Sequence, residues 1–229
     1  MKVLTLKNYR LLAEYGEVAS ALKNTVVMVA TTATATVVLS FLVSLVVIRS
    51  KFWGRRLLDQ LAFMPHAIPG IVMGIAFFWL FLQLDFLPLY GTIWAISIGF
   101  TISFLAYGTR SMNAALLQIH KELEEAAYVS GAPPWRTMWR IFVPLLMPTL
   151  VGVWIWVVLH AVRIAGMPLM LYEGPGNQVL AILIWNMWDE GYVPAVAAIG
   201  TLMMIALLLL TLLIRLVGFR RHAVQTVNP

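Results

Sequence analysis

The sequence contains no cysteine and few charged residues. The absence of cysteine excludes disulfide bonds and metal sites with thiolate ligands, but it indicates nothing about the cellular compartment. Only 11% of the residues are charged, whereas 61% are hydrophobic and the mean hydropathy is +0.87. An ordinary soluble domain has an apolar fraction of roughly one half. A chain of this composition is therefore predicted to be a membrane protein.

The patterns that mark common enzyme sites are also missing. The sequence has no HExxH metal-ligand pattern, no GxSxG nucleophile turn and no Walker A lysine loop. An intramembrane enzyme would need paired polar catalytic residues at matching depth, and the apolar runs carry no pair of carboxylates. We therefore predict that the chain has no catalytic residue and no metal site, and that it binds no cofactor.

Five runs without Asp, Glu, Lys or Arg account for the hydrophobicity. Each is near or above the roughly 20 residues that a helix needs to cross a bilayer. The runs are rich in Leu, Val, Ala and Ile, and they do not alternate as the strands of a membrane barrel do. The predicted fold is an all-α transmembrane bundle, with a transmembrane domain over residues 24–217. Its five spans are predicted at about 24–48, 61–83, 89–109, 141–162 and 194–215.

The basic residues are unevenly distributed between the two ends of these spans. Of the 16 Lys and Arg residues, four follow the first span, four follow the third and three follow the fifth, which places 11 on one side. The positive-inside rule makes this side cytoplasmic. The prediction then has an external amphipathic segment at 1–23 and a cytoplasmic tail at 218–229. The net charge of +6 reflects contact with membrane lipid rather than with nucleic acid.

The second span opens with residues that disrupt a helix. Pro65 and Pro69 lack the backbone N–H that a helix uses, and Gly70 thins the helix, so a kink or a break is predicted here. Irregular backbone at membrane depth requires protein or a watery cavity beside it. Two interpretations stay open for Pro65, His66, Pro69 and Gly70: a plain packing kink, or the lining of a transport pathway.

Polar residues also occur at the outer end of the fourth span. His160 and Arg163 are three residues apart and would share a helical face. They either extend to the membrane interface or contact a solute in a pathway. The external segment that follows has about 32 residues and is apolar, yet it contains Gly174, Pro175 and Gly176. A helical hairpin that dips toward the membrane is predicted for it.

The connection between the third and fourth spans, residues 118–140, is predicted to form a protruding cytoplasmic elbow. If residues 120–131 are helical, one narrow face consists of small residues that permit close docking of a partner. Gly131 suits a left-handed C-terminal cap, and Pro133 and Pro134 suit the first turn of a second short helix. The residues of the docking face are Leu123, Ala126, Ala127 and Ser130.

This elbow resembles the signature of the inner-membrane permease subunits of type I ABC importers. The signature is Glu-Ala-Ala, three residues, Gly, nine residues, Ile, one residue and usually Leu-Pro, and here Val143 occupies the Leu position. The LKNY start, the MPHAIPG segment and the stretch around GPG extend the resemblance over nearly the whole chain, toward iron(III)-type permeases and their polyamine and phosphonate relatives. The residues that match the signature are Glu125, Ala126, Ala127, Gly131, Ile141 and Pro144.

The resemblance implies a role in ATP-driven import. In that family the elbow is a coupling helix in a groove of a cytoplasmic ABC ATPase dimer, so the six signature residues would couple this chain to the ATPase. A second permease half, identical or different, would complete the pathway. An extracytoplasmic binding protein would deliver a solute, with iron(III) favoured and polyamine or phosphonate as alternatives. The chain would lie in the cell inner membrane, and ATP and Mg would be bound by the ATPase.

Two departures from the family pattern accompany the resemblance. Family members commonly carry a further helix ahead of the LKNY-like segment. The chain would then be a truncated half, a split gene product or a five-helix variant, and we expect a longer reading frame or an adjacent gene to supply the helix. Relatives often have an acidic residue after the arginine that corresponds to Arg163, where this chain has Ile164. The alternative function is a membrane anchor or sensor that recruits cytoplasmic partners without transport, and it would not need Pro and Gly breaks in the second span.

Overall fold

The computed structural model describes residues 7–84 and 86–225. Within these residues the chain is helical throughout, and the β-structure consists of one isolated bridge between Gly91 and Tyr172. The all-α class predicted from the uninterrupted apolar runs is confirmed. Residues 1–6 and 226–229, the ends of the predicted external segment and tail, lie outside the described residues.

The chain divides into two compact units. The smaller unit combines residues 1–19 with residues 183–229, and in it α1 (Lys7–Glu14) contacts α11 (Val193–Gln225). The larger unit is Ser20–Ile182 and contains the elbow. α10 (Leu180–Asp189) begins in the larger unit and ends in the smaller one.

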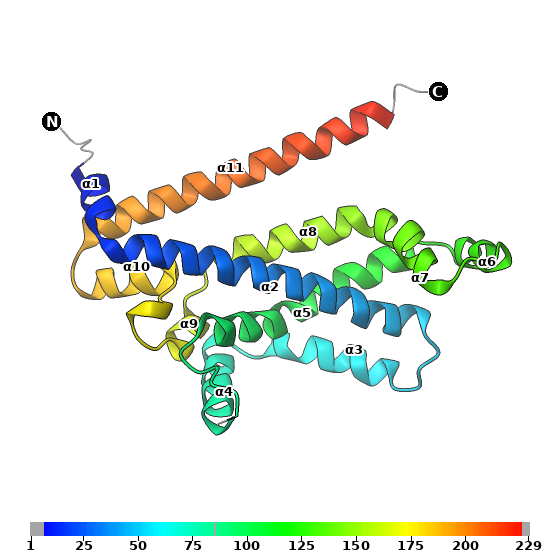
Figure 1. The fold of residues 1–229 in the computed structure, drawn as a ribbon, viewed down its shortest axis with the longest axis horizontal. Helices are drawn as coiled ribbons and strands as arrows, with labels where there is room; N and C mark the ends of the chain where they lie inside the picture. The colour runs from blue at the N-terminus through cyan, green and yellow to red at the C-terminus, as the bar shows by residue number, and fades with distance from the viewer. Residues whose placement is uncertain (1–6, 85, 226–229) are drawn as a thin grey trace. The chain divides into compact units, whose positions relative to one another are not determined.

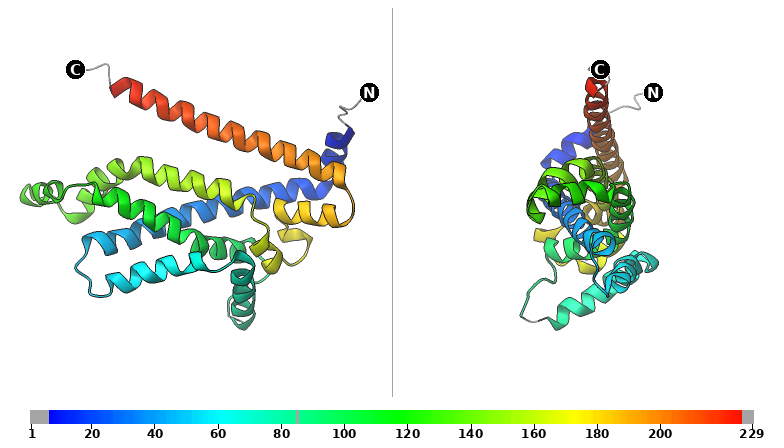
Figure 2. Two further views of the ribbon diagram at one scale, coloured as in Figure 1. Left: turned by 180° about the vertical axis from the view of Figure 1, so that it is seen from behind. Right: turned by 90° about the vertical axis from the view of Figure 1, so that its right-hand side faces the viewer.

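Three long helices run side by side in the larger unit (Figures 1 and 2): most of α2 (Gly16–Arg49), α5 (Ile93–Leu117) and α8 (Val143–Ala161). α2 begins inside the predicted external segment, which therefore continues directly into the first span. Thr92 is the N-cap of α5. Its side-chain oxygen accepts a hydrogen bond from the Ala95 N–H at 3.3 Å and so caps the helix.

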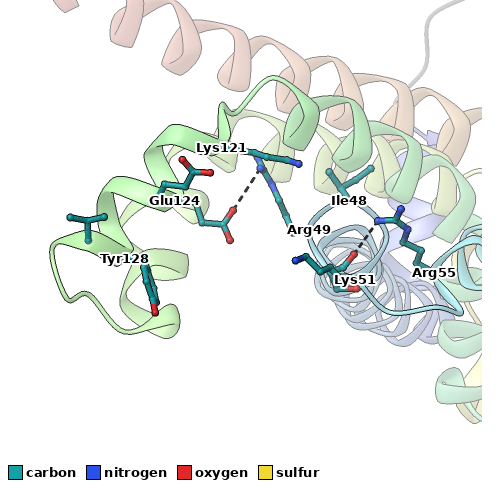
Figure 3. Close-up of a pocket in the computed structure, with 10 residues that line it drawn as sticks. Ile48, Arg49, Lys51, Arg55, Lys121, Glu124 and Tyr128 are labelled. Carbon is teal, nitrogen blue, oxygen red and sulfur yellow. Dashed lines mark hydrogen bonds and ion pairs between the residues drawn. The ribbon is translucent and has the colours of Figure 1, made fainter.

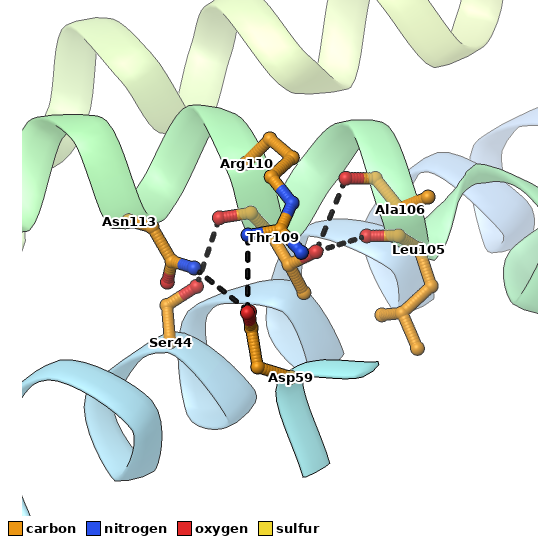
Figure 4. Close-up of polar contacts among 7 residues, drawn as sticks. All are labelled: Ser44, Asp59, Leu105, Ala106, Thr109, Arg110 and Asn113. Carbon is orange, nitrogen blue, oxygen red and sulfur yellow. Dashed lines mark hydrogen bonds and ion pairs between the residues drawn. The ribbon is translucent and has the colours of Figure 1, made fainter. Parts of the chain in front are cut away.

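Small polar residues bring α2 and α5 close together. Ser44 donates a hydrogen bond through Oγ to the Thr109 carbonyl at 3.3 Å (Figure 4). Gly108 faces Ser40 so closely that an added Cβ would lie 2.9 Å from the Ser40 Cβ. Small side chains permit such an approach between membrane helices, which cannot gain stability from expelling water. The polar residues of α2 buried along this helix are Thr25, Thr32, Thr36, Ser40 and Ser44.

The predicted break in the second span is confirmed. α3 (Arg55–Phe63) and a 3-10 turn η1 (Met64–Ala67) meet α4 (Gly70–Gln83) at an angle of 111°. Pro69, at the N-cap of α4, has extended backbone (φ −56°, ψ 139°) and no N–H, which ends one helix and allows another to start in a new direction. α4 then packs on α9 (Gly166–Leu171).

The segment predicted as an external hairpin is helical. It contains α9, a 3-10 turn η3 (Pro175–Asn177) and α10, and Gly174 turns the chain with φ of +73°. Among the residues that the structure describes, three helical stretches are long and apolar enough to cross a membrane: Gly16–Arg49, Pro134–Ala161 and Val193–Leu212. The bent pair of α3 with η1 and α4 would make a fourth. The predicted third span lies largely in α5, and the count of five spans and their orientation stay predictions.

Candidate functional site

The elbow begins with α6 (Lys121–Val129), which ends in a Schellman cap. The Gly131 N–H donates to the Tyr128 carbonyl at 2.9 Å, and the Ala132 N–H donates to the Ala127 carbonyl at 3.0 Å. This pair of bonds requires a left-handed residue at Gly131, whose φ is +73°. The cap predicted from the position of this glycine is confirmed.

The second arm of the elbow returns the chain to the bundle. α7 (Pro134–Thr137) starts with Pro134 at its first position, because this position needs no N–H donor. A π-helical turn η2 (Met138–Phe142) follows and leads directly into α8. Ile141 lies half-buried in this turn, and Pro144 lies exposed in the first turn of α8. The predicted second short helix is confirmed.

α6 is almost entirely accessible. It has no buried residue, Glu125 and Ala126 are exposed, and Ala127 is half-buried. Tyr128 and Val129 are 82% and 86% exposed, which is unusual for large apolar side chains. Apolar residues exposed together on a short projecting helix are typical of a surface that contacts another protein.

One arginine at the end of α2 connects the elbow to the bundle (Figure 3). The Nη2 group of Arg49 donates to the Leu116 carbonyl at 3.0 Å and to the Ile119 carbonyl at 2.6 Å, next to the C-terminal end of α5. Its Nη1 lies 3.7 Å from the Glu124 carboxylate on α6, and its guanidinium lies 5.3 Å from the centre of the Phe142 ring. In the sequence, Arg49 is only one of the four basic residues after the first span, because nothing there places these carbonyls beside it.

A second polar cluster joins α3 to α5 (Figure 4). Asp59 accepts a hydrogen bond from Arg110 Nη1 at 3.1 Å and another from Asn113 Nδ2 at 3.2 Å. The Arg110 guanidinium also lies 4.8 Å from the centre of the Phe63 ring. This cluster fixes α3, which carries the chain toward the break at Pro69. The cluster cannot be predicted from the sequence, because Asp59 and Arg110 flank different apolar runs.

The predicted pathway residues form two separate groups. Pro65 and His66 lie in η1, the latter exposed with its ring 5.8 Å from that of Phe63. Pro69 and Gly70 are exposed at the break. In the described part of the chain, no hydrogen bond, ion pair or ring contact joins this group to His160 or Arg163, so a shared pathway stays a prediction.

His160 belongs to an aromatic stack on α8. The centre of its ring lies 3.8 Å from that of Trp156, and the ring of Tyr107 on α5 stacks on the same tryptophan at 3.7 Å between ring centres. The His160 Nδ1 is 2.8 Å from the Trp156 carbonyl oxygen. Arg163 lies beyond the end of α8 in an exposed turn. No cluster of three or more His, Asp or Glu residues suited to a metal ion occurs among the described residues.

The fold and the elbow agree with a known family of membrane proteins. Residues 36–222 match the family described as "Binding-protein-dependent transport system inner membrane component". The chain belongs to this family. The match includes the α6 elbow, the broken α3–α4 segment and α8, so the resemblance inferred from the Glu-Ala-Ala signature is confirmed.

Members of the family that resemble the chain are named for several solutes. The ferric transport system permease protein FbpB of Actinobacillus pleuropneumoniae is 28% identical over 214 residues, which cover 91% of this chain and 31% of that protein. A candidate 2-aminoethylphosphonate permease of Salmonella paratyphi A is 27% identical over 156 residues, which cover 68% of this chain and 58% of that protein. The sulfate permease CysT of Synechocystis is 26% identical over 190 residues, which cover 78% of this chain and 66% of that protein. The chain thus spans less than a third of the ferric relative and just over half of the phosphonate relative.

Solved structures of ABC transporters share the fold. A bacterial transporter for import of the acidic polysaccharide alginate superposes with a TM-score of 0.74 at 16% identity, covering 100% of this chain and 86% of that chain. The MetNI methionine transporter in an inward-facing conformation gives a TM-score of 0.67 at 18% identity, covering 99% and 100%. At these identities the likeness establishes the fold alone.

Proposed function

We propose that the chain is a transmembrane permease half of an ATP-driven importer, and that the α6 elbow is its coupling element to an ABC ATPase dimer. The observation that carries the proposal is the exposed, Schellman-capped helix that presents the family signature. Glu125, Ala126 and Ala127 lie on this helix, Gly131 ends it, and Ile141 and Pro144 lie where the chain rejoins the bundle. ATP and Mg belong to the partner ATPase, and this chain hydrolyses nothing.

The proposed assembly has two further partners. A second permease half, identical or different, would complete the transport pathway, and an extracytoplasmic binding protein would deliver the solute. Iron(III) is the favoured solute because a ferric relative aligns with 91% of the chain. Phosphonate and sulfate relatives support those anions as alternatives. A membrane anchor that only recruits partners is less favoured, because the 111° break in the second span has no use in an anchor.

We expect a P-loop ATPase to co-purify with the chain when both are expressed with the neighbouring transport genes. In proteoliposomes, the binding protein loaded with iron(III) should stimulate ATP hydrolysis more than the same preparation loaded with 2-aminoethylphosphonate or sulfate, because the loaded binding protein drives the transport cycle. If the binding protein loaded with one of the two anions stimulates hydrolysis more, that anion rather than iron(III) is the transported solute. Absence of any retained ATPase would overturn the permease assignment itself.

The proposed topology predicts which positions face the outside. Because the chain has no cysteine, single cysteines can be placed without removing native ones. Cysteines at Glu14, Asp85 and Asn177 should react with an impermeant thiol reagent added to intact cells. Cysteines at Arg55, Ser130 and Gln225 should react only after the membrane is opened, because 11 of the 16 basic residues lie on their side. Labelling of a cysteine at Ser130 in intact cells would show that the chain has the opposite orientation to the proposed one.

A further inference from the structure

We propose that Arg49 is the tether that transmits movement between the α6 elbow and the helix bundle, with Glu124 as its releasable partner. This inference rests on the proposed function and adds a positioning residue to it. The family signature covers residues 125–144, whereas Arg49 lies about 75 positions earlier in the sequence, at the end of α2. Its role follows from contacts that only the folded chain creates.

The contacts of Arg49 with the bundle are close. Its side chain is 10% exposed, and one nitrogen, Nη2, donates to the two carbonyls of Leu116 and Ile119. Carbonyls at a helix C-terminus carry partial negative charge and lack partners within the helix, so a buried cation beside them is held firmly. Phe142, whose ring faces the guanidinium, belongs to a buried apolar cluster with Leu116 and Leu146. Arg49 is therefore fixed on the bundle side.

The contact of Arg49 with the elbow is much looser. The Nη1 of Arg49 and the Glu124 carboxylate are 3.7 Å apart, and the Glu124 side chain is 48% exposed. An ion pair of this length with one partner in solvent contributes little stability and breaks easily. The Nε–H of Arg49 is buried and has no hydrogen-bond partner among the described residues. A donor is thus available for an acceptor in a second arrangement of the elbow.

The space around this ion pair permits such a rearrangement (Figure 3). A pocket of about 740 Å³ lies on one side, bounded by Lys51 and Arg55 after α2 and by Lys121 and Glu125 on α6. A second pocket of about 370 Å³ lies between Leu45 of α2 and Met138 of the returning arm. Both pockets are lined by Arg49 and Glu124. Because two pockets adjoin the pair, α6 has open space into which it can tilt when the pair changes its geometry.

A tether of this kind makes the bundle respond to movement of the elbow. When an ATPase moves α6, the Arg49–Glu124 contact transmits the displacement to the ends of α2, α5 and α8 at one point. Without it, α6 would still present its docking surface, which Arg49 does not form. The chain would still connect α6 to α5 and α7, but the bundle would follow the elbow less closely. Binding of the ATPase and transmission of its movement are therefore separable properties.

The test uses spin labels in the full chain, assembled with its ATPase in nanodiscs. Cysteines replace Leu42 on α2, which is 49% exposed, and Lys121 at the start of α6, which is exposed and lies outside the docking face. Distances between the labels are measured without nucleotide and with ATP plus vanadate. The variants are Arg49→Met, which keeps the length but loses the charge, Arg49→Lys, and Glu124→Gln. Matched controls are Arg55→Met, an exposed arginine of the same pocket, and Glu122→Gln on the same helix.

We expect the parent protein and both controls to show a narrow distance distribution that shifts with ATP plus vanadate. Arg49→Met and Glu124→Gln should retain the ATPase but show a broader distribution and a smaller shift than the parent. Arg49→Lys should give an intermediate result, because a single ammonium cannot span two carbonyls and a carboxylate at once. A role limited to stability would lower the amount of protein and leave the shift intact.

A normal shift in Arg49→Met, or an equal loss in Arg55→Met, would overturn the tether. The proposed function fails separately, if the parent chain retains no ATPase. In that case the width of the distribution without nucleotide still decides whether Arg49 holds the elbow. An unchanged width in Arg49→Met would refute the tether, and a broader one would support it.

Discussion

Gly131→Val should abolish ATPase association while the protein still inserts into the membrane. Gly131 closes the Schellman cap of α6 with φ of +73°, a conformation that costs a β-branched residue on the order of 1–3 kcal/mol. The backbone strain is relieved most easily if the turn opens. An open turn would redirect α6 and α7 away from their docking geometry. Each 1.4 kcal/mol reduces the competent fraction about tenfold. Co-purification of the ATPase and solute uptake, each divided by membrane abundance, measure the effect.

A matched control exists at the end of α10. Gly191 has φ of +83°, its N–H donates to the Trp188 carbonyl at 3.1 Å, and the Tyr192 N–H donates to the Met187 carbonyl at 2.8 Å. This is the same cap in another part of the chain, and neither glycine has an atom within 4 Å of an added Cβ. Gly191→Val should bring equal strain but keep the ATPase. Equal ATPase retention by the two variants would refute the coupling role of the elbow.

Gly108→Leu should strongly destabilise the bundle. A Cβ at this position would lie 2.9 Å from the Ser40 Cβ and 3.4 Å from the Thr36 Cγ2, before the rest of the leucine is placed. Both neighbours are fully buried on α2 and have no space to withdraw. Overfilling a packed contact costs about 1–3 kcal/mol and occasionally more. We expect low membrane abundance and a lower midpoint of thermal unfolding in detergent.

Gly152→Leu is the control for this substitution. Gly152 lies within α8, and no atom lies within 4 Å of an added Cβ. Replacing glycine by leucine there should raise helix stability slightly, because glycine is the poorer helix former by somewhat less than about 1 kcal/mol. The abundance of this variant should equal or exceed that of the parent. A comparable loss in both variants would mean that bulk in any span, rather than the α2–α5 contact, limits folding.

Local features of the sequence were sufficient to predict the helices and the elbow. The apolar runs predicted an all-α chain, the Pro65 and Pro69 pair predicted the break, and Gly131 predicted a left-handed cap. Each of these depends on residues within a few positions of one another, through missing N–H donors, allowed backbone angles or solubility in lipid. Motif spacing within the elbow also pointed to the family, which the match over residues 36–222 confirms.

The contacts between distant segments depended on the tertiary structure. Arg49 was predicted only as a positive-inside residue, since the Leu116 and Ile119 carbonyls that it binds come from a helix that begins over forty residues later. Asp59 and Arg110 likewise gave no sign of pairing, and Gly108 gave no sign of facing Ser40. Packing of one helix on another is set by side-chain shape across the interface, and a single sequence records neither the partner nor the rotation of each helix. The sequence alone therefore determined the helices and the capped elbow, whereas the packing of the bundle determined how the elbow is held.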